Sequence, residues 1–243
     1  LVRSYVVKKK STNGVIEESL VEAESSSLQG VIHESAKNIS KVLSRSSKIY
    51  NNVIKGLSMH DLSELKKNKK QVTKLSEEVD RLKDKLFYFI KNLDESSLGA
   101  SNFYINLLGY LQDITQSVEY VSKISHKHIN NNHSKLTLNQ IRDLLAIQEV
   151  MSRLFETIST TFKQKSFEEI KAVLKDKNKT IGLLEDKIES QIARTRTSEE
   201  KSPKNAALYF SILQESKDLM KEVMSLIEEY YVSYDKSVKP AKP

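Results

Sequence analysis

Five acidic residues in two stretches of the chain could form a metal-binding patch. The first stretch contains Asp113 and Glu119, and the second contains Glu215, Asp218 and Glu222. Carboxylates three or four residues apart lie on one face of a helix, where two of them can chelate a hard cation. Exposed acids are also common on helices. We therefore treat the five as weak metal candidates and favour a solvated helix surface.

Three histidines, His126, His128 and His133, are further candidates for metal ligands. His126 and His128 are two residues apart, which places them on different faces of a helix. Zinc sites often add cysteine ligands at set spacings, and the chain has no Cys. We therefore expect histidines at a helix end, where they complement the dipole, and no zinc site.

A basic group lies near the expected end of one helix, where Arg194 and Arg196 are followed by Lys201 and Lys204. These cations could hold a phosphate or an acidic partner. Complementation of the helix dipole and solubility explain the same residues, and we favour that interpretation.

Three tyrosines, Tyr230, Tyr231 and Tyr234, gather near the C-terminal end of the sequence. Tyrosine is enriched at protein interfaces, so they could form a patch that faces a partner. Packing over the open end of a helical bundle explains them equally well, and both interpretations stay open.

No motif for catalysis is found in the sequence. A Gly-rich phosphate loop, a nucleophile elbow and a zinc-binding HExxH are all absent, and the six glycines are scattered singly. Without cysteine there is no thiol nucleophile. We therefore predict a protein that binds or regulates, with no catalytic residues and no cofactor.

The composition predicts a helical protein. Among 243 residues there are only 6 Gly and 3 Pro, too few for the turns of a β fold. The net charge of +7 could favour nucleic acid or anionic lipid, but Lys and Glu alternate along most of the chain, which favours simple solubility. The exceptions are Lys8–Lys10 and the run from Lys66 to Lys70. No stretch is apolar for ~18 residues, as a membrane span requires.

Apolar residues three and four apart predict six long helices. Asp61 with Glu64, Thr137, and Ser166 with Glu169 are expected to cap helix starts, and Pro203 suits a first helical position. The helices are expected at about 18–57, 61–93, 94–130, 137–162, 166–197 and 203–234.

The asparagine run that starts at Asn130 is the strongest internal boundary and divides the six helices three and three. We therefore predict an all-α fold of two tandem antiparallel three-helix bundles, 18–130 and 137–234, joined by a linker at 131–136. Residues 1–17 are expected to be an extended basic lead-in and 235–243 a disordered tail. A single extended coiled coil is the alternative, but short connections between long helices favour antiparallel neighbours.

An internal repeat supports this division. An offset of 102 residues aligns Leu111-Gln112-Asp113 with Leu213-Gln214-Glu215, and Val121 with Val223. Both stretches fall on the last helix of a predicted bundle. Two tandem three-helix bundles with related motifs on their third helices resemble the PhoU family, whose motif reads roughly Leu-Glu-Arg-Ile-x-Asp-His-Ala-x-x-Ile. The stretches 108–133 and 194–219 look like one branch of it, the cytoplasmic tails of bacterial sodium–phosphate cotransporters.

The departures from that motif concern metal binding. The family's Glu and Asp, four apart on one helical face, hold metal-ion clusters. Here the first copy has Gln112 and Gln116, and the second has Gln214 and Asp218, so one carboxylate remains of four. Amides are weak ligands and carry no charge. We therefore expect the family's multinuclear metal site to be lost or much weakened.

The resemblance implies a regulatory domain that modulates sodium-dependent phosphate uptake by helical contacts on the cytoplasmic side of the inner membrane. Its implied partner is a membrane-embedded transporter domain of the same polypeptide; regulatory proteins or a homodimer are further options, and nucleic acid is not expected. A chain that starts at Leu1 is what the part following such a domain would look like. Lys8–Lys10 would then lie near the membrane, or simply in a solvated linker.

Two other functions compete with this one. A stand-alone helical scaffold or adaptor, unrelated to phosphate, would need only the amphipathic helices. A nucleic-acid-binding helical protein is suggested by the net charge of +7 alone, and the mixed charge pattern makes it the weakest of the three.

Overall fold

The computed structural model describes residues 27–93, 97–197 and 199–234, and every regular element in these ranges is helical. The all-α prediction is therefore confirmed. The predicted lead-in 1–17, the tail 235–243 and the first residues of the helix expected at 18 lie outside the described residues. The elements are α1 (Leu28–Met59), α2 (Leu62–Lys91), α3 (Leu98–Asn130), α4 (Leu138–Gln164), a 3₁₀ turn (Phe167–Glu169), α5 (Ile170–Lys175), α6 (Lys177–Arg196) and α7 (Pro203–Ser233).

Several helix starts are those the sequence predicts. The Asp61 carboxylate accepts a hydrogen bond from the Glu64 backbone N–H at 3.0 Å. Thr137 begins α4 with a complete capping box that includes Gln140, and Pro203 occupies the first turn of α7. At the boundary after α3, Asn132 adopts a left-handed conformation with φ of 56°, which asparagine tolerates better than most residues.

The predicted fifth helix is wrong as a single element. The structure divides it into the 3₁₀ turn, α5 and α6. Ser166 makes no side-chain cap, because its backbone oxygen takes the Glu169 N–H in a 3₁₀ hydrogen bond of 3.0 Å. The second break falls at Asp176, in a polar run from Lys175 to Thr180 that has no apolar side chain to hold a continuous helix on the core.

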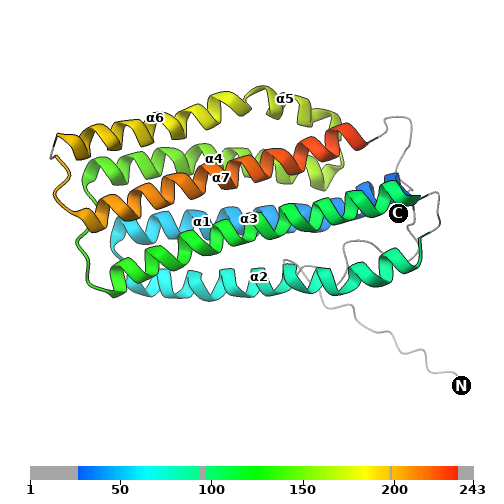
Figure 1. The fold of residues 1–243 in the computed structure, drawn as a ribbon, viewed down its shortest axis with the longest axis horizontal. Helices are drawn as coiled ribbons and strands as arrows, with labels where there is room; N and C mark the ends of the chain where they lie inside the picture. Colours follow the sequence, from blue (N-terminus) through cyan, green and yellow to red (C-terminus); the bar gives the residue numbers. More distant parts are fainter. Residues whose placement is uncertain (1–26, 94–96, 198, 235–243) are drawn as a thin grey trace, which may run out of the picture.

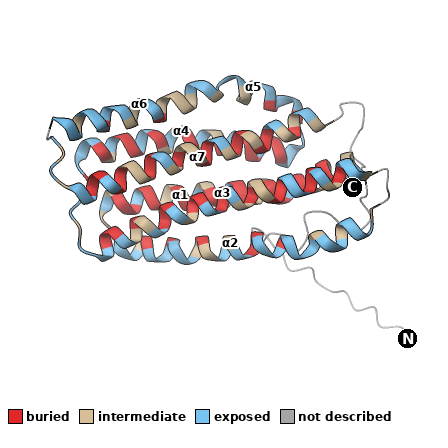
Figure 2. Ribbon diagram, viewed as in Figure 1, coloured by how far each residue is buried: buried red, intermediate tan, exposed pale blue. Residues whose placement is uncertain are grey.

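The helices lie roughly along one direction (Figure 1). Helix α1 packs against α2, α3 and α4, and α7 packs against α3 and α6. Figure 2 shows that burial is concentrated on the four central helices α1, α3, α4 and α7, whereas α2 and α6 at the two edges are largely exposed. The edges differ in anchoring, since α2 buries seven residues and α6 buries only Leu184 and Gln191.

One continuous apolar core includes side chains from both halves of the chain. Two hydroxyl pairs cross it from α1 to α7: Tyr50 meets Ser216 at 2.7 Å, and Tyr230 meets Ser35 at 2.6 Å. Burial without partners would penalise these hydroxyls, so the pairs fix how α7 is rotated against α1. Within the described residues, no helix is long and apolar enough to cross a bilayer.

A shared core predicts that the two halves unfold together. Leu213 of α7 is fully buried, and Leu213→Ala should lower the free energy of unfolding by about 2–5 kcal/mol. Native-state hydrogen exchange of the strongly protected amides should then show protection falling by the same amount in α3 as in α7. Unchanged protection in α3 would show that the halves are independent folding units.

Candidate functional site

The two motif copies meet where α3 and α7 pack against each other. The Asn106 side-chain amide of α3 donates to Glu229 of α7 at 3.3 Å. Burial first, and then the charges of Asp113 and Asp218, raise the pKa of Glu222. These contacts pair early residues of α3 with late residues of α7, so the helices are antiparallel and the stretch 111–121 lies beside 213–223.

The structure brings four of the five acidic candidates together. Burial also raises the pKa of Glu215, opposed by a hydrogen bond from Ser117 and reinforced by the charge of Asp218. Asp218 thus acts on both Glu215 and Glu222, and Asp113 lies close to Glu222. Glu119 stands apart, in an ion pair with Lys123 at 2.8 Å.

Two of the three glutamines in the repeated stretches, Gln112 and Gln214, make hydrogen bonds to neighbouring acids. The Gln112 amide donates to Asp80 of α2 at 3.1 Å. The Gln214 amide donates to both carboxylate oxygens of Asp218 at 3.3 Å. Gln116 is exposed. In the described ranges, no group of three or more His, Cys, Asp or Glu side chains has the geometry of a metal site.

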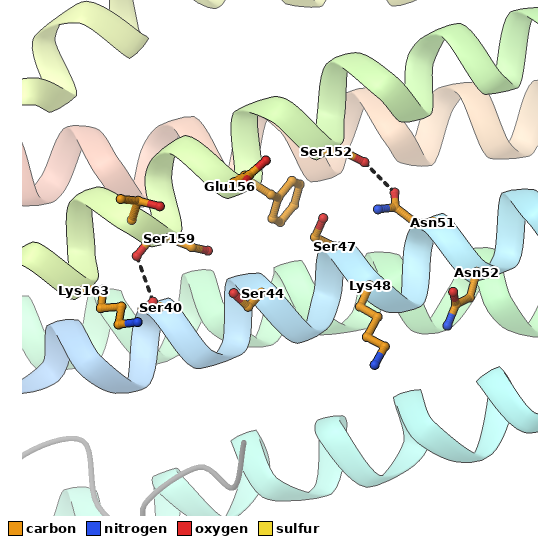
Figure 3. Close-up of a pocket in the computed structure, with 12 residues that line it drawn as sticks. Ser40, Ser44, Ser47, Lys48, Asn51, Asn52, Ser152, Glu156, Ser159 and Lys163 are labelled. Carbon is orange, nitrogen blue, oxygen red and sulfur yellow. Dashed lines mark hydrogen bonds between the residues drawn. The ribbon is translucent and has the colours of Figure 1, made fainter. Parts of the chain in front are cut away.

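A polar groove of about 490 Å³ runs between α1 and α4, and we call it the seam. Figure 3 shows its hydroxyl and amide side chains facing one another from the two helices. Ser40 donates to the backbone oxygen of Ser159 at 2.9 Å, and Ser152 donates to Asn51 at 2.8 Å. The two hydrogen bonds join the first half of the chain to the second.

The rest of the seam is polar and carries charge at its rim. Lys48 and Lys163 contribute positive charge and Glu156 one negative charge. The Ser159 hydroxyl lines the seam and is buried without a hydrogen-bond partner, which costs about 1–3 kcal/mol unless a polar group satisfies it. The seam is therefore suited to small polar molecules.

The seam was not predicted from the sequence, although a signal for it is present there. Ser40, Ser44, Ser47 and Asn51 step by four, three and four residues, which is the spacing of one helix face. Serine is common on solvated helix surfaces, so the stripe became informative only once α4 was found opposite it.

Arg194 lies in the last turn of α6, as predicted, and also belongs to a partly buried ionic network. Asp143 of α4 accepts hydrogen bonds from Lys187 at 2.8 Å, from Arg194 at 3.1 Å and from the Tyr209 hydroxyl at 2.9 Å. The Arg194 guanidinium also lies 5.8 Å from the centre of the Tyr209 ring. Arg194 therefore has a specific acidic partner within the chain, in addition to its place in the last turn of α6.

Electrostatics in this network favour the ionised carboxylate. Burial alone would raise the pKa of Asp143, but hydrogen bonds from Lys187, Tyr209 and Arg194 outweigh it and lower the pKa. The same arrangement raises the pKa of the Tyr209 hydroxyl, through burial first and then through Asp143. The network ties α4 to α6 and α7. The other cations of the predicted group, Arg196, Lys201 and Lys204, are exposed.

The three histidines do not converge on one site. The His128 ring is buried, its Nε2 lies 3.1 Å from the Ser134 carbonyl oxygen, and its centre lies 5.0 Å from that of His133. His126 instead lines a groove with lysines of α2.

Tyr230 does not face a partner. It is fully buried, and its ring centre lies 4.5 Å from that of Phe162 and 5.1 Å from that of Phe103. Tyr234 packs on Phe167 at 5.7 Å. These aromatic side chains come from both halves of the chain and close one end of the shared core.

Comparisons with models of protein families, with curated proteins and with solved structures give no match to this chain. The resemblance to PhoU-like tails therefore depends on the residues quoted in the sequence analysis.

Asp143→Asn should destabilise the protein by roughly 1.5–3 kcal/mol, the usual contribution of hydrogen bonds to a charged group, because Lys187 and Arg194 lose their counter-charge. The lowered pKa means that Asp143 stabilises the fold above its unfolded pKa of about 3.9 and that this contribution is lost as pH falls through the folded pKa. Urea unfolding at neutral and acidic pH measures both effects. A variant with unchanged acid sensitivity would contradict the assignment.

Because Gln112, Gln116 and Gln214 carry amides and not carboxylates, we predict that the purified protein contains little bound metal. Protein purified without chelator should hold less than one equivalent of Fe, Zn or Mn by elemental analysis, since amides are weaker ligands than carboxylates. More than one tightly held ion per chain would overturn this prediction.

Proposed function

We propose that this chain is a non-catalytic regulatory domain similar to the PhoU-like cytoplasmic tails of sodium–phosphate cotransporters, and that it modulates phosphate uptake through helical contacts. The observation that carries the proposal is the meeting of the two motif copies, one on α3 and one on α7, in antiparallel packing.

The arrangement of the remaining helices supports a tandem repeat of three-helix bundles. A shift of 102 positions along the sequence, from Leu111 to Leu213, aligns most of α1 with α4 and most of α3 with α7. Both pairs lie in contact. The same offset relates α2 to the segment divided between α5 and α6, and each of these packs at an outer edge (Figure 1).

The seam suggests how such a domain responds to its surroundings. Beside the apolar core, α1 and α4 are joined there by hydroxyl and amide contacts, which can be exchanged for contacts with water or other polar partners at low cost. A small displacement of α4 along α1 would change the packing of both halves, because they share one core. The partner that receives it would be the membrane-embedded domain of the same polypeptide, on the cytoplasmic side of the inner membrane; regulatory proteins or a second copy are further candidates.

The alternative is a stand-alone helical scaffold unrelated to phosphate. It is favoured by the loss of the family's motif carboxylates at Gln112, Gln116 and Gln214. The gene discriminates the two, because a transporter tail requires several upstream hydrophobic segments of about 20 residues each.

The functional test compares sodium-dependent uptake of labelled phosphate by the full-length protein and by a form lacking residues 18–234, in phosphate-replete cells without other phosphate transporters. A restraining domain predicts that its removal raises uptake at least about fivefold, the lower end of typical allosteric coupling. Membrane levels of both proteins, measured by immunoblot, are the control. Equal uptake by the two forms, or a gene without hydrophobic segments, would leave the scaffold as the better explanation.

A further inference from the structure

A basic groove of about 660 Å³ follows the outer surface of α2 and reaches α3. Four lysines and one arginine line it against a single acid, Glu77, so the lining carries a net charge of +4 with His126 neutral. The lining residues are Lys66, Lys69, Lys70, Thr73, Lys74, Glu77, Arg81 and His126. This surface includes most of the lysine run that departs from the alternating charge pattern of the sequence.

The cations of the groove are available to a ligand. All five are exposed, and among the described residues none forms an ion pair with an acid. Their successive spacings are three, one, four and seven residues on the exposed side of α2, and they extend, from Lys66 to Arg81, over about 22 Å of helix. Burial first, and then the charges of Lys69 and Lys66, lower the pKa of His126. Five cations gathered along one helix face with a single acid among the lining residues are arranged for an extended anionic surface.

The same face of α2 ends in exposed aromatic residues. Tyr88 follows Arg81 by about two helical turns, and Phe87 follows Lys69 by about five, so both continue the face of the groove. Phe87 is 67% exposed and Tyr88 63% exposed. Single exposed apolar side chains are ordinary, but neighbouring ones that form a patch beside a charged groove indicate an interaction surface.

Helix α3 adds apolar side chains at this end. The Phe89 ring stacks on Tyr104 at 4.5 Å, which places the end of α2 beside the start of α3. Leu98 and Ile105 of α3 are 69% and 45% exposed and lie near this contact in the chain. Helix α2 lies at one edge of the helix array, opposite α5 and α6 (Figure 1). We call the groove together with these apolar residues the basic–aromatic face.

We propose that the basic–aromatic face docks on an anionic lipid surface. The lysines and Arg81 would contact lipid phosphates, while Phe87, Tyr88 and Leu98 enter the boundary between headgroups and acyl chains. Combining polybasic attraction with aromatic and aliphatic insertion is the usual requirement for peripheral membrane binding. Phe87 and Tyr88 could also stack on bases, but the exposed aliphatic side chains of Leu98 and Ile105 favour the acyl-chain boundary of a lipid surface over a nucleic acid. The proposal does not depend on attachment to a transporter.

Vesicle co-sedimentation of the intact chain tests this proposal. Binding is expected to vesicles of phosphatidylcholine mixed with phosphatidylglycerol, and much less to phosphatidylcholine alone. A lysine near an anionic surface contributes about fivefold in affinity, so the triple variant Lys66→Gln, Lys70→Gln and Lys74→Gln should bind on the order of 100-fold more weakly. All three side chains are exposed, so circular dichroism should show unchanged helicity.

The matched control removes the same charge from the opposite edge. Lys171, Lys175 and Lys179 are exposed and lie on α5 and α6. Replacing these three with Gln should change vesicle affinity by less than about threefold. The double variant Phe87→Ser and Tyr88→Ser should weaken binding about tenfold or more, at low and high salt alike, because the apolar contribution is not screened.

Three results would overturn the proposal. The first is equal binding to neutral and anionic vesicles. The second is equal loss of affinity in the two triple lysine variants, which would indicate attraction by net charge alone. The third is salt-dependent binding to a generic duplex that is tighter than binding to anionic vesicles, which would assign the face to nucleic acid.

Discussion

The structure depends on the need of the central helices to bury side chains toward both halves of the chain. Helix α1 contacts α2 and α3 of its own half and α4 of the other half, so the two halves share its buried stripe. If only the first half of the chain packed against α1, some of its apolar side chains would stay exposed to water. The Tyr50–Ser216 and Tyr230–Ser35 pairs meet the same constraint in polar form, because each hydroxyl finds its buried partner on the far half. The seam and the motif contact both follow from this arrangement.

Features encoded by neighbouring residues could be predicted from the sequence. The starts of α2, α4 and α7 follow from Asp61, Thr137 and Pro203, whose effects act within one helical turn. The break at Asp176 was missed because apolar residues on both sides keep helical spacing, and only the packing of Phe167 and Ile170 into the core shows that the segment bends. Local signals predict elements, whereas the burial of distant side chains decides their continuity.

The candidate sites were less predictable, since each needs residues from two or more helices. Asp143 is one acid in a mixed run, and nothing nearby in the chain indicates that Lys187, Arg194 and Tyr209 converge on it. The serines of the seam likewise become a surface only beside α4. The acids around Asp218 could be named in advance because the repeat identified two related stretches, which shows the value of internal comparison when single residues are uninformative.

The antiparallel contact of α3 and α7 has a consequence for how this chain can change over generations. Two like stretches that face each other resemble the two sides of a symmetric homodimer. In a homodimer one substitution changes the contact on both subunits. In this single chain Gln116 and Asp218, which the 102-residue offset aligns, are encoded separately. One half can therefore diversify while the other is conserved. A face such as the basic groove on α2 can therefore exist at one edge of the helix array without a counterpart on α6.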